Sequence, residues 1–103
     1  MQSLIEIAEA VRAGKRSARD ALEQSLAAIA EKNPALNAFI MLDEESARAQ
    51  ADAIDARIAR GEDPGKLAGV PIGVKDVENC IGFPTTQGSL LMKDAPVADA
   101  DSI

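Results

Sequence analysis

The chain has no histidine, no tryptophan, no tyrosine and a single cysteine among its 103 residues. Without histidine it cannot contain a Ser-His-Asp or Cys-His catalytic arrangement, or a zinc site built on histidine. Cys80 has no second cysteine with which to form an internal disulfide. Because no histidine base is available to activate it, we interpret Cys80 as a packing or loop thiol rather than a reactive one.

Other absences limit the kinds of partner. Two phenylalanines are too few for platforms on which bases stack, and a net charge of -6 opposes binding to a phosphate backbone. No uncharged apolar run approaches the length of a membrane span. The segment Met1–Ser3 lacks a basic region ahead of an apolar core, so we expect no secretory signal. We therefore expect a cytoplasmic chain with no direct nucleic-acid partner and no membrane contact.

Three helices are predicted from apolar spacing and end signals. Apolar side chains in residues 4–11 recur at helical spacing, and Gly14 is placed to end that helix. Ser17 is placed to cap a second helix, with Asp20 three residues later, and Asn33–Pro34 should stop it. At 103 residues the chain is at most one domain, and a hydrophobic fraction of 47% indicates that it is globular.

The third helix has the clearest signals. Asp43 is expected to cap it, and Gly61 follows its last turn. One face consists of Ala47, Ala51, Ile54 and Ile58. We interpret it as a helix that packs on a sheet and exposes its charged face to water, rather than as a partner surface.

Two short apolar runs, residues 38–42 and 67–76, are predicted to be strands. In the second, Val70, Ile72 and Val74 share one face, while Gly73 and Lys75 share the other. Lys75 therefore leaves the strand on a face that Gly73 has left open. Two explanations remain at this point. Lys75 is a general base in apolar surroundings, or it marks the end of the strand where charges meet water.

The stretch from Glu78 to Pro96 is predicted to be irregular, because glycine and proline punctuate it. Its hydroxyl side chains, Thr85, Thr86 and Ser89, have two possible roles. They line a substrate cleft, or they satisfy the amides of a turn.

Four segments occur in an order that resembles the amidase-signature hydrolases. They are Asn33–Phe39, the lysine segment Leu67–Asp76, the Thr-Thr-Gln-Gly-Ser loop within Ile81–Ser89, and Ala98–Ile103. The resemblance runs from about Leu4 onward, and the lysine segment is its most specific part. It implies an α/β fold, the N-terminal part of a large mixed β-sheet core covered by helices, here helices plus about two strands.

The resemblance also implies a reaction, the hydrolysis of a C–N amide bond through an acyl-enzyme. Members of this family use a serine nucleophile, a second serine held in a cis peptide and a lysine, and Lys75 matches that lysine. The implied substrate is a small-molecule amide, with no cofactor and no metal. The family also includes the glutaminase component of a tRNA-dependent amidotransferase, and these residues do not separate that component from a free amidase.

Both serines of this triad belong to a later Gly/Ser-rich segment that residues 1–103 do not contain. In addition, Asp101 is placed to cap a helix with only two residues after it, and two strands cannot form an independent sheet. We therefore expect residues 1–103 to be an N-terminal segment that is inactive alone. Its partner would be the remainder of its own catalytic domain, with a homo-oligomer possible. The alternative is a non-catalytic truncated fragment or a small helical interaction module.

Overall fold

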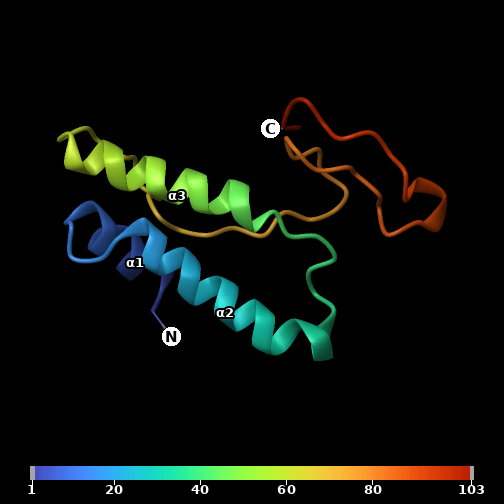
Figure 1. The fold of residues 1–103 in the computed structure, drawn as a ribbon, viewed down its shortest axis with the longest axis horizontal. Coiled ribbons are helices and arrows are strands. Elements are labelled where there is room, and N and C mark those ends of the chain that lie inside the picture. The colour runs from blue at the N-terminus through green and yellow to red at the C-terminus, as the bar shows by residue number, and fades with distance from the viewer. Residues whose placement is uncertain (1, 103) are drawn as a thin grey trace. The chain divides into compact units, whose positions relative to one another are not determined.

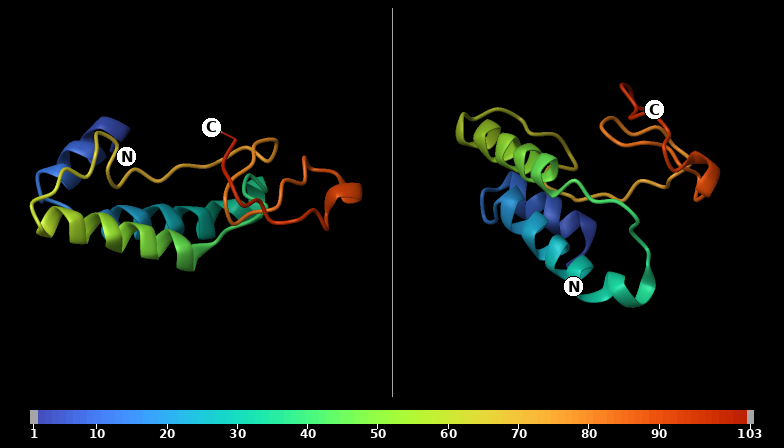
Figure 2. Two further views of the ribbon diagram at one scale, coloured as in Figure 1. Left: turned by 90° about the horizontal axis from the view of Figure 1, so that it is seen from above. Right: turned by 45° about the vertical axis from the view of Figure 1, so that its right-hand side comes forward.

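The computed structural model describes residues 2–102 and divides into two compact units, Met1–Pro71 and Ile72–Ile103. The first unit contains a pair of antiparallel helices, α2 and α3, that lie side by side (Figure 1). Figure 2 shows α1 lying against the end of this pair where α2 begins. The second unit is a loop with one short 3-10 turn. The elements are α1 Leu4–Arg12, α2 Ala18–Leu36, α3 Glu44–Ala59 and η1 Leu90–Met92.

The first helix is confirmed at both ends. The Ser3 side chain accepts a hydrogen bond from the Glu6 amide (3.1 Å), and the Glu6 carboxylate accepts one from the Ser3 amide (2.8 Å). This reciprocal pair satisfies two amides that the helix start leaves without partners. After the helix, Gly14 adopts a left-handed φ of 72° and its amide donates to the carbonyl of Val11 (3.1 Å).

The second helix begins as predicted, with the Ser17 hydroxyl accepting from the Asp20 amide (2.9 Å). Its predicted stop was wrong, because α2 continues through Pro34 to Leu36. A proline removes only one amide donor, and the fixed φ of its ring is close to the helical value. The helix instead ends at Asn37, which is left-handed with a φ of 50°.

Asn33 explains why the chain turns after α2. Its side-chain amide donates to the Phe39 carbonyl (2.8 Å), and its side-chain oxygen accepts from the Phe39 amide (2.8 Å). The Asn37 amide also donates to the Asn33 carbonyl (2.7 Å). One asparagine therefore holds the end of the helix and the segment that leaves it.

The third helix is confirmed, with Asp43 accepting from the Ser46 amide (3.1 Å) and Gly61 following at a φ of 76°. From the C-terminal half of this helix, the Asp55 carboxylate accepts hydrogen bonds from the first two amides of α2, those of Ala18 (2.7 Å) and Arg19 (3.1 Å). A carboxylate is favourable at a helix N-terminus because the amides there carry partial positive charge. Asp55 therefore joins α3 to the start of α2.

The core of the first unit gathers where α1, α2 and α3 meet. Val11 is fully buried, and Gly69, in the segment that follows α3, lies against it. Gly69 has a φ of 76°, and a Cβ atom placed on it would lie 2.7 Å from a methyl carbon of Val11. The buried set is Val11, Ala18, Ala51 and Ala68, with Ile7, Leu22, Ile54 and Ile58 packed on it.

We predict that Gly69→Ala destabilises the protein more than Gly65→Ala does. Both positions have a left-handed φ, 76° and 93°, so both substitutions carry a backbone cost of about 1–2 kcal/mol. Only Gly69 also meets a buried side chain, and overpacking adds roughly 1–3 kcal/mol. Denaturant melts of the two variants measure the difference. Equal losses of stability would contradict the close contact between Gly69 and Val11.

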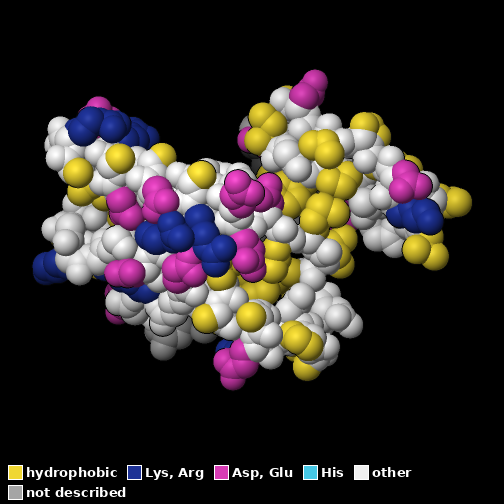
Figure 3. Space-filling view, in the orientation of Figure 1, with side chains coloured by type: hydrophobic (Ala, Val, Ile, Leu, Met, Phe, Trp, Pro, Cys, Tyr) yellow, Lys and Arg dark blue, Asp and Glu magenta, His cyan; other side chains and the backbone are white. Residues whose placement is uncertain are grey.

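Charged side chains cover the outer surface of α2 and α3, where dark blue and magenta groups alternate in Figure 3. Glu23 of α2 lies between Arg48 of α3 (2.7 Å) and Arg19 of its own helix (2.9 Å). Arg19 also contacts Asp52 of α3 (2.9 Å). Hydrogen bonds from Arg48 first, and then from Arg19, lower the pKa of Glu23 to about 2. The network therefore connects the two helices most strongly while Glu23 is ionised.

We predict that Glu23→Gln lowers the melting temperature at neutral pH and that the deficit disappears in acid. The pKa of Glu23 is lowered on folding, so its contribution is complete above the ordinary glutamate pKa and is lost as the pH falls toward about 2. The effect should be modest and salt-sensitive, because the network is exposed. Glu31→Gln, on the same helix, is the control. A deficit for Glu23→Gln that is independent of pH would contradict the ion-pair explanation.

The two predicted strands are not formed in the described chain. Residues 38–42 and 67–76 have no ladder partners, and between residues 2 and 102 the only β-type pairing recorded is an isolated bridge from Pro84 to Val97. A strand requires a neighbouring strand to pair its backbone amides and carbonyls. The side chains expected to be buried are exposed instead, Ile72 by 78% and Val74 by 48%.

Candidate active site

Lys75 lies in the second unit, in a segment without regular structure, and its side chain is exposed. Its carbonyl accepts a hydrogen bond from the Glu78 amide (3.1 Å), which closes a turn immediately after it. Lys75 takes part in none of the ion pairs recorded for residues 2–102. The lysine is therefore carried on a fixed turn without an acidic partner in the described chain.

The neighbouring carboxylate of Asp76 is bound by Thr86, ten residues later. The Thr86 amide donates to one oxygen of Asp76 (2.8 Å), and the Thr86 hydroxyl donates to the other. The Gln87 amide donates to the backbone carbonyl of Asp76 (2.9 Å). The hydrogen bonds from the Thr86 hydroxyl first, and then from the Thr86 amide, lower the pKa of the Asp76 carboxyl below its ordinary value. Thr86 itself is buried.

The other hydroxyls of this loop also bond to the loop itself. The Thr85 hydroxyl donates to the side-chain oxygen of Asn79 (2.8 Å), and Ser89 accepts from the Leu91 amide (3.2 Å). The sequence left two roles for these hydroxyls, lining a substrate cleft or bonding to polar groups of the turn. The structure supports the second.

The base of the loop is closed by residues 79–84 and 97–102, which run side by side. Their hydrogen bonds hold the Lys75 segment and the chain end in one unit. They join Gly82 N to Ala98 O (3.0 Å), Ala98 N to Phe83 O (2.9 Å), Asn79 N to Ser102 Oγ (2.7 Å), Ser102 N to Asn79 O (3.0 Å) and Ile81 N to Asp101 Oδ1 (2.7 Å).

Asp101, which the sequence places as a helix cap, accepts a hydrogen bond from the Ile81 amide in the described residues. A carboxylate beside free amides binds the nearest one, and here that amide belongs to a loop rather than a helix. Cys80, which lies between these pairings, is a partly buried free thiol.

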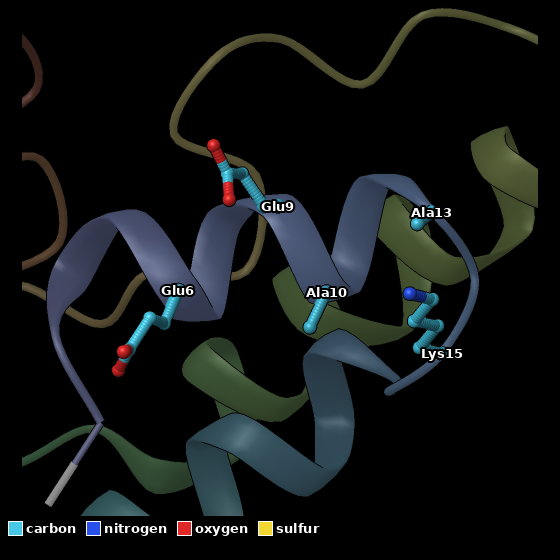
Figure 4. Close-up of a pocket in the computed structure, with 5 residues that line it drawn as sticks. All are labelled: Glu6, Glu9, Ala10, Ala13 and Lys15. Atoms are coloured by element: carbon cyan, nitrogen blue, oxygen red, sulfur yellow. The ribbon is translucent and has the colours of Figure 1, made fainter.

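A shallow depression on α1 offers no competing site. It is lined by Glu6, Glu9, Ala10, Ala13 and Lys15, and in Figure 4 the two carboxylates point in different directions. Binding sites instead bring a few polar groups together in a concave, largely apolar pocket.

Within residues 2–102, no three metal-binding side chains are grouped to hold an ion. Nor does any helix in that range combine the length and apolarity that crossing a bilayer requires.

Solved structures define the class of fold. The chain superposes with a TM-score of 0.92 and 43% identity on a chain from a vestigial protein complex that reveals the evolutionary origins of an s-triazine catabolic enzyme. It superposes with a TM-score of 0.87 and 34% identity on a bacterial aryl acylamidase of the amidase-signature enzymes. In both cases it covers 97% of itself and only 22% or 21% of the neighbour. The likeness to the aryl acylamidase supports an α/β fold of the amidase-signature class for this chain.

The family follows from the sequence match. The Amidase family model matches residues 20–103, so this chain belongs to the amidase family. It is 43% identical over 99 residues to AtzE, a 1-carboxybiuret hydrolase subunit of Pseudomonas sp. (strain ADP). It is also 43% identical over 102 residues to a glutamyl-tRNA(Gln) amidotransferase subunit of Bdellovibrio bacteriovorus. The chain covers 22% and 21% of these relatives, which is about a fifth of their length.

Sequence reasoning singled out Lys75 as a candidate base but did not predict the bond between Asp76 and Thr86. The available signal was weak, because a carboxylate and a threonine ten residues apart face each other only when the chain between them turns back. Phe83–Pro84 and Gln87–Gly88 mark such a turn, and Gln87 has a left-handed φ of 54°. Because the chain turns back on both sides of Thr86, its hydroxyl could meet an acceptor from an earlier segment.

Proposed function

We propose that residues 1–103 are the N-terminal portion of a serine-dependent amidase and that Lys75 is its general base. One observation carries this proposal. Lys75 lies within the part of the chain that matches the amidase family, on a turn fixed by hydrogen bonds and without an acidic partner in residues 2–102. In its neutral form a lysine side chain can accept a proton, which is the task of a general base.

In the proposed reaction, a serine oxygen attacks the carbonyl carbon of an amide. Its proton passes to the bridging serine, whose own proton passes to neutral Lys75. The tetrahedral intermediate collapses, the C–N bond breaks, and the leaving nitrogen takes the proton back from Lys75 along the same path. Water then attacks the acyl-enzyme in the same sequence and releases the carboxylic acid. Both serines belong to the remainder of the catalytic domain, which we propose as the partner of this segment.

The proposed substrate is a small-molecule amide with a non-peptide C–N bond. Two neighbours have names in this class, aryl acylamidase and 1-carboxybiuret hydrolase, while others are named glutamyl-tRNA(Gln) amidotransferase. A free amidase and an ammonia-supplying component of an amidotransferase share the same acylation step. In both, water then releases the acid from the acyl-enzyme. They differ in the fate of the ammonia, which is released into solution or passed to a second active site.

The test uses the full-length protein that carries this segment, incubated with glutamine, aliphatic amides and 4-nitroacetanilide. We expect release of ammonia or amine, and an acyl adduct on a serine detected by intact-mass spectrometry. Hydrolysis of these amides through a bound metal, with no serine adduct on any substrate, would show that the proposed chemistry is wrong.

The 103-residue polypeptide alone should not hydrolyse any of these amides. It has no Gly/Ser-rich segment to supply a nucleophile, and a lysine base has nothing to activate without one. Colorimetric and ammonia-release assays of the purified polypeptide measure this. Turnover above background that disappears in Lys75→Ala would show that it carries its own nucleophile.

A further inference from the structure

We propose that Asp76 and Thr86 are positioning residues that hold Lys75 in place for proton transfer, an inference that rests on the function proposed above. Neither side chain is assigned contact with the substrate. Their part is to fix the backbone from which Lys75 projects.

The hydrogen bonds surround the Lys75–Asp76 peptide. On one side, the Lys75 carbonyl accepts from the Glu78 amide (3.1 Å). On the other, the Asp76 carbonyl accepts from the Gln87 amide (2.9 Å), and the Asp76 side chain accepts from Thr86 twice. Four hydrogen bonds therefore restrain the backbone at the lysine, three of them from the Thr86–Gln87 turn. A proton-transfer group needs this restraint, because a misplacement of about 1 Å can cost roughly 10²-fold in rate.

The hydrogen bonds between Asp76 and Thr86 are charge-assisted, because the acceptor is a carboxylate. Hydrogen bonds to an ionised carboxylate are about twice as strong as neutral ones, and this carboxylate receives an amide and a hydroxyl from one residue. Thr86 is only 9% exposed and is the only buried polar side chain recorded in the described chain. Removing its partner would leave two shielded donors unsatisfied, so the turn would rearrange.

The same bond engages both oxygens of the Asp76 carboxylate, which is next to the lysine in the sequence. A free carboxylate beside a lysine favours the charged ammonium, which cannot accept a proton. Because Thr86 occupies both oxygens of Asp76, that carboxylate is committed elsewhere. Loss of the Thr86 hydroxyl frees one oxygen to approach Lys75. Both consequences, a looser turn and a new counter-ion, slow proton transfer.

The test is the labelling of the full-length protein by a fluorophosphonate, which reacts with a serine only when a base activates it. For each variant, labelling is followed as a single exponential at several fluorophosphonate concentrations, and the rate constants give the limiting rate and the half-saturating concentration. Unfolded molecules then reduce the amplitude of labelling and leave the rate constant unaffected. Lys75→Ala establishes whether labelling depends on the proposed base.

We expect Asp76→Ala and Thr86→Val to lower the limiting rate about 10²-fold with an unchanged half-saturating concentration. Thr86→Ser keeps the amide and the hydroxyl and should label nearly as fast as wild type. Thr85→Val is the matched control, because it makes the same change one residue earlier, where the hydroxyl bonds to Asn79. It should stay within about twofold of wild type.

The outcomes separate the two proposals. If Lys75→Ala labels as fast as wild type, the proposed function is wrong whatever the other variants do. If Lys75→Ala is slow while Thr86→Val keeps the wild-type rate, only the positioning inference is overturned. Thr86→Val, which preserves side-chain volume, decides the question should Asp76→Ala fail to fold. A fall for Thr85→Val equal to that for Thr86→Val would also overturn it.

Discussion

Under the proposed function, replacing Lys75 by alanine in the full-length protein is expected to lower kcat by about 10²–10⁴-fold, the usual cost of losing a positioned base. The loss should exceed this range if the lysine and the two serines act as one unit. The fold should be nearly unaffected, because the Lys75 side chain is exposed and fills no core volume. Steady-state hydrolysis of the best amide substrate, alongside a thermal melt, measures both quantities.

Lys93→Ala is the matched control for that experiment. Lys93 is an exposed lysine in the same unit and, like Lys75, takes part in none of the ion pairs recorded for the described chain. It should retain the wild-type kcat. A similar loss in both variants would show that the unit tolerates no change of charge, and it would remove the case for Lys75 as a base.

The second large effect concerns the 103-residue polypeptide on its own, which we expect to associate and to unfold without a cooperative transition in the Ile72–Ile103 unit. Hydrophobic side chains are spread over the surface of this unit (Figure 3). Ile72 is 78% exposed, Leu90 86% and Leu91 96%. Burying a side chain of this size contributes about 1.5–3 kcal/mol, so a few of them equal the whole margin of a small domain.

Hydrogen exchange and sedimentation of that polypeptide measure this effect. The amides of α2 and α3 should be protected longest, since those helices pack against each other. The amides around Val74 should exchange rapidly. A monomer with a sharp melt and long-lived protection near Val74 would show that residues 72–102 form a stable unit without a cover.

The helices could be predicted from sequence because their signals are local. Ser17 caps the amide of Asp20 three residues away, and Asp43 caps that of Ser46 in the same way. Capping depends on neighbours along the chain, so an inspection of the sequence detects it. The predicted stop at Pro34 was wrong because α2 continues through the proline to Leu36 and ends at the left-handed Asn37.

Long-range features could not be predicted in this way. Asp55 caps α2 from 37 residues away, and Asp76 binds Thr86 across a reversal of the chain. The apolar runs at 38–42 and 67–76 predict strands because they are short and apolar, and glycine and proline interrupt the second. A strand also needs partners, and none is recorded in residues 2–102. Lys75 was found through its resemblance to a family, whereas the restraint around it was visible only in the structure.

The most direct test of the central claim is single-turnover acylation of the full-length enzyme and its Lys75→Arg variant, followed by rapid quenching and intact-mass spectrometry. Arginine keeps the positive charge but remains protonated at any working pH, so it cannot accept the proton of a serine. If Lys75 is the base, wild type forms the acyl-enzyme and Lys75→Arg forms none on the same timescale. Acylation of Lys75→Arg at nearly the wild-type rate would contradict the account, because charge alone would then be sufficient.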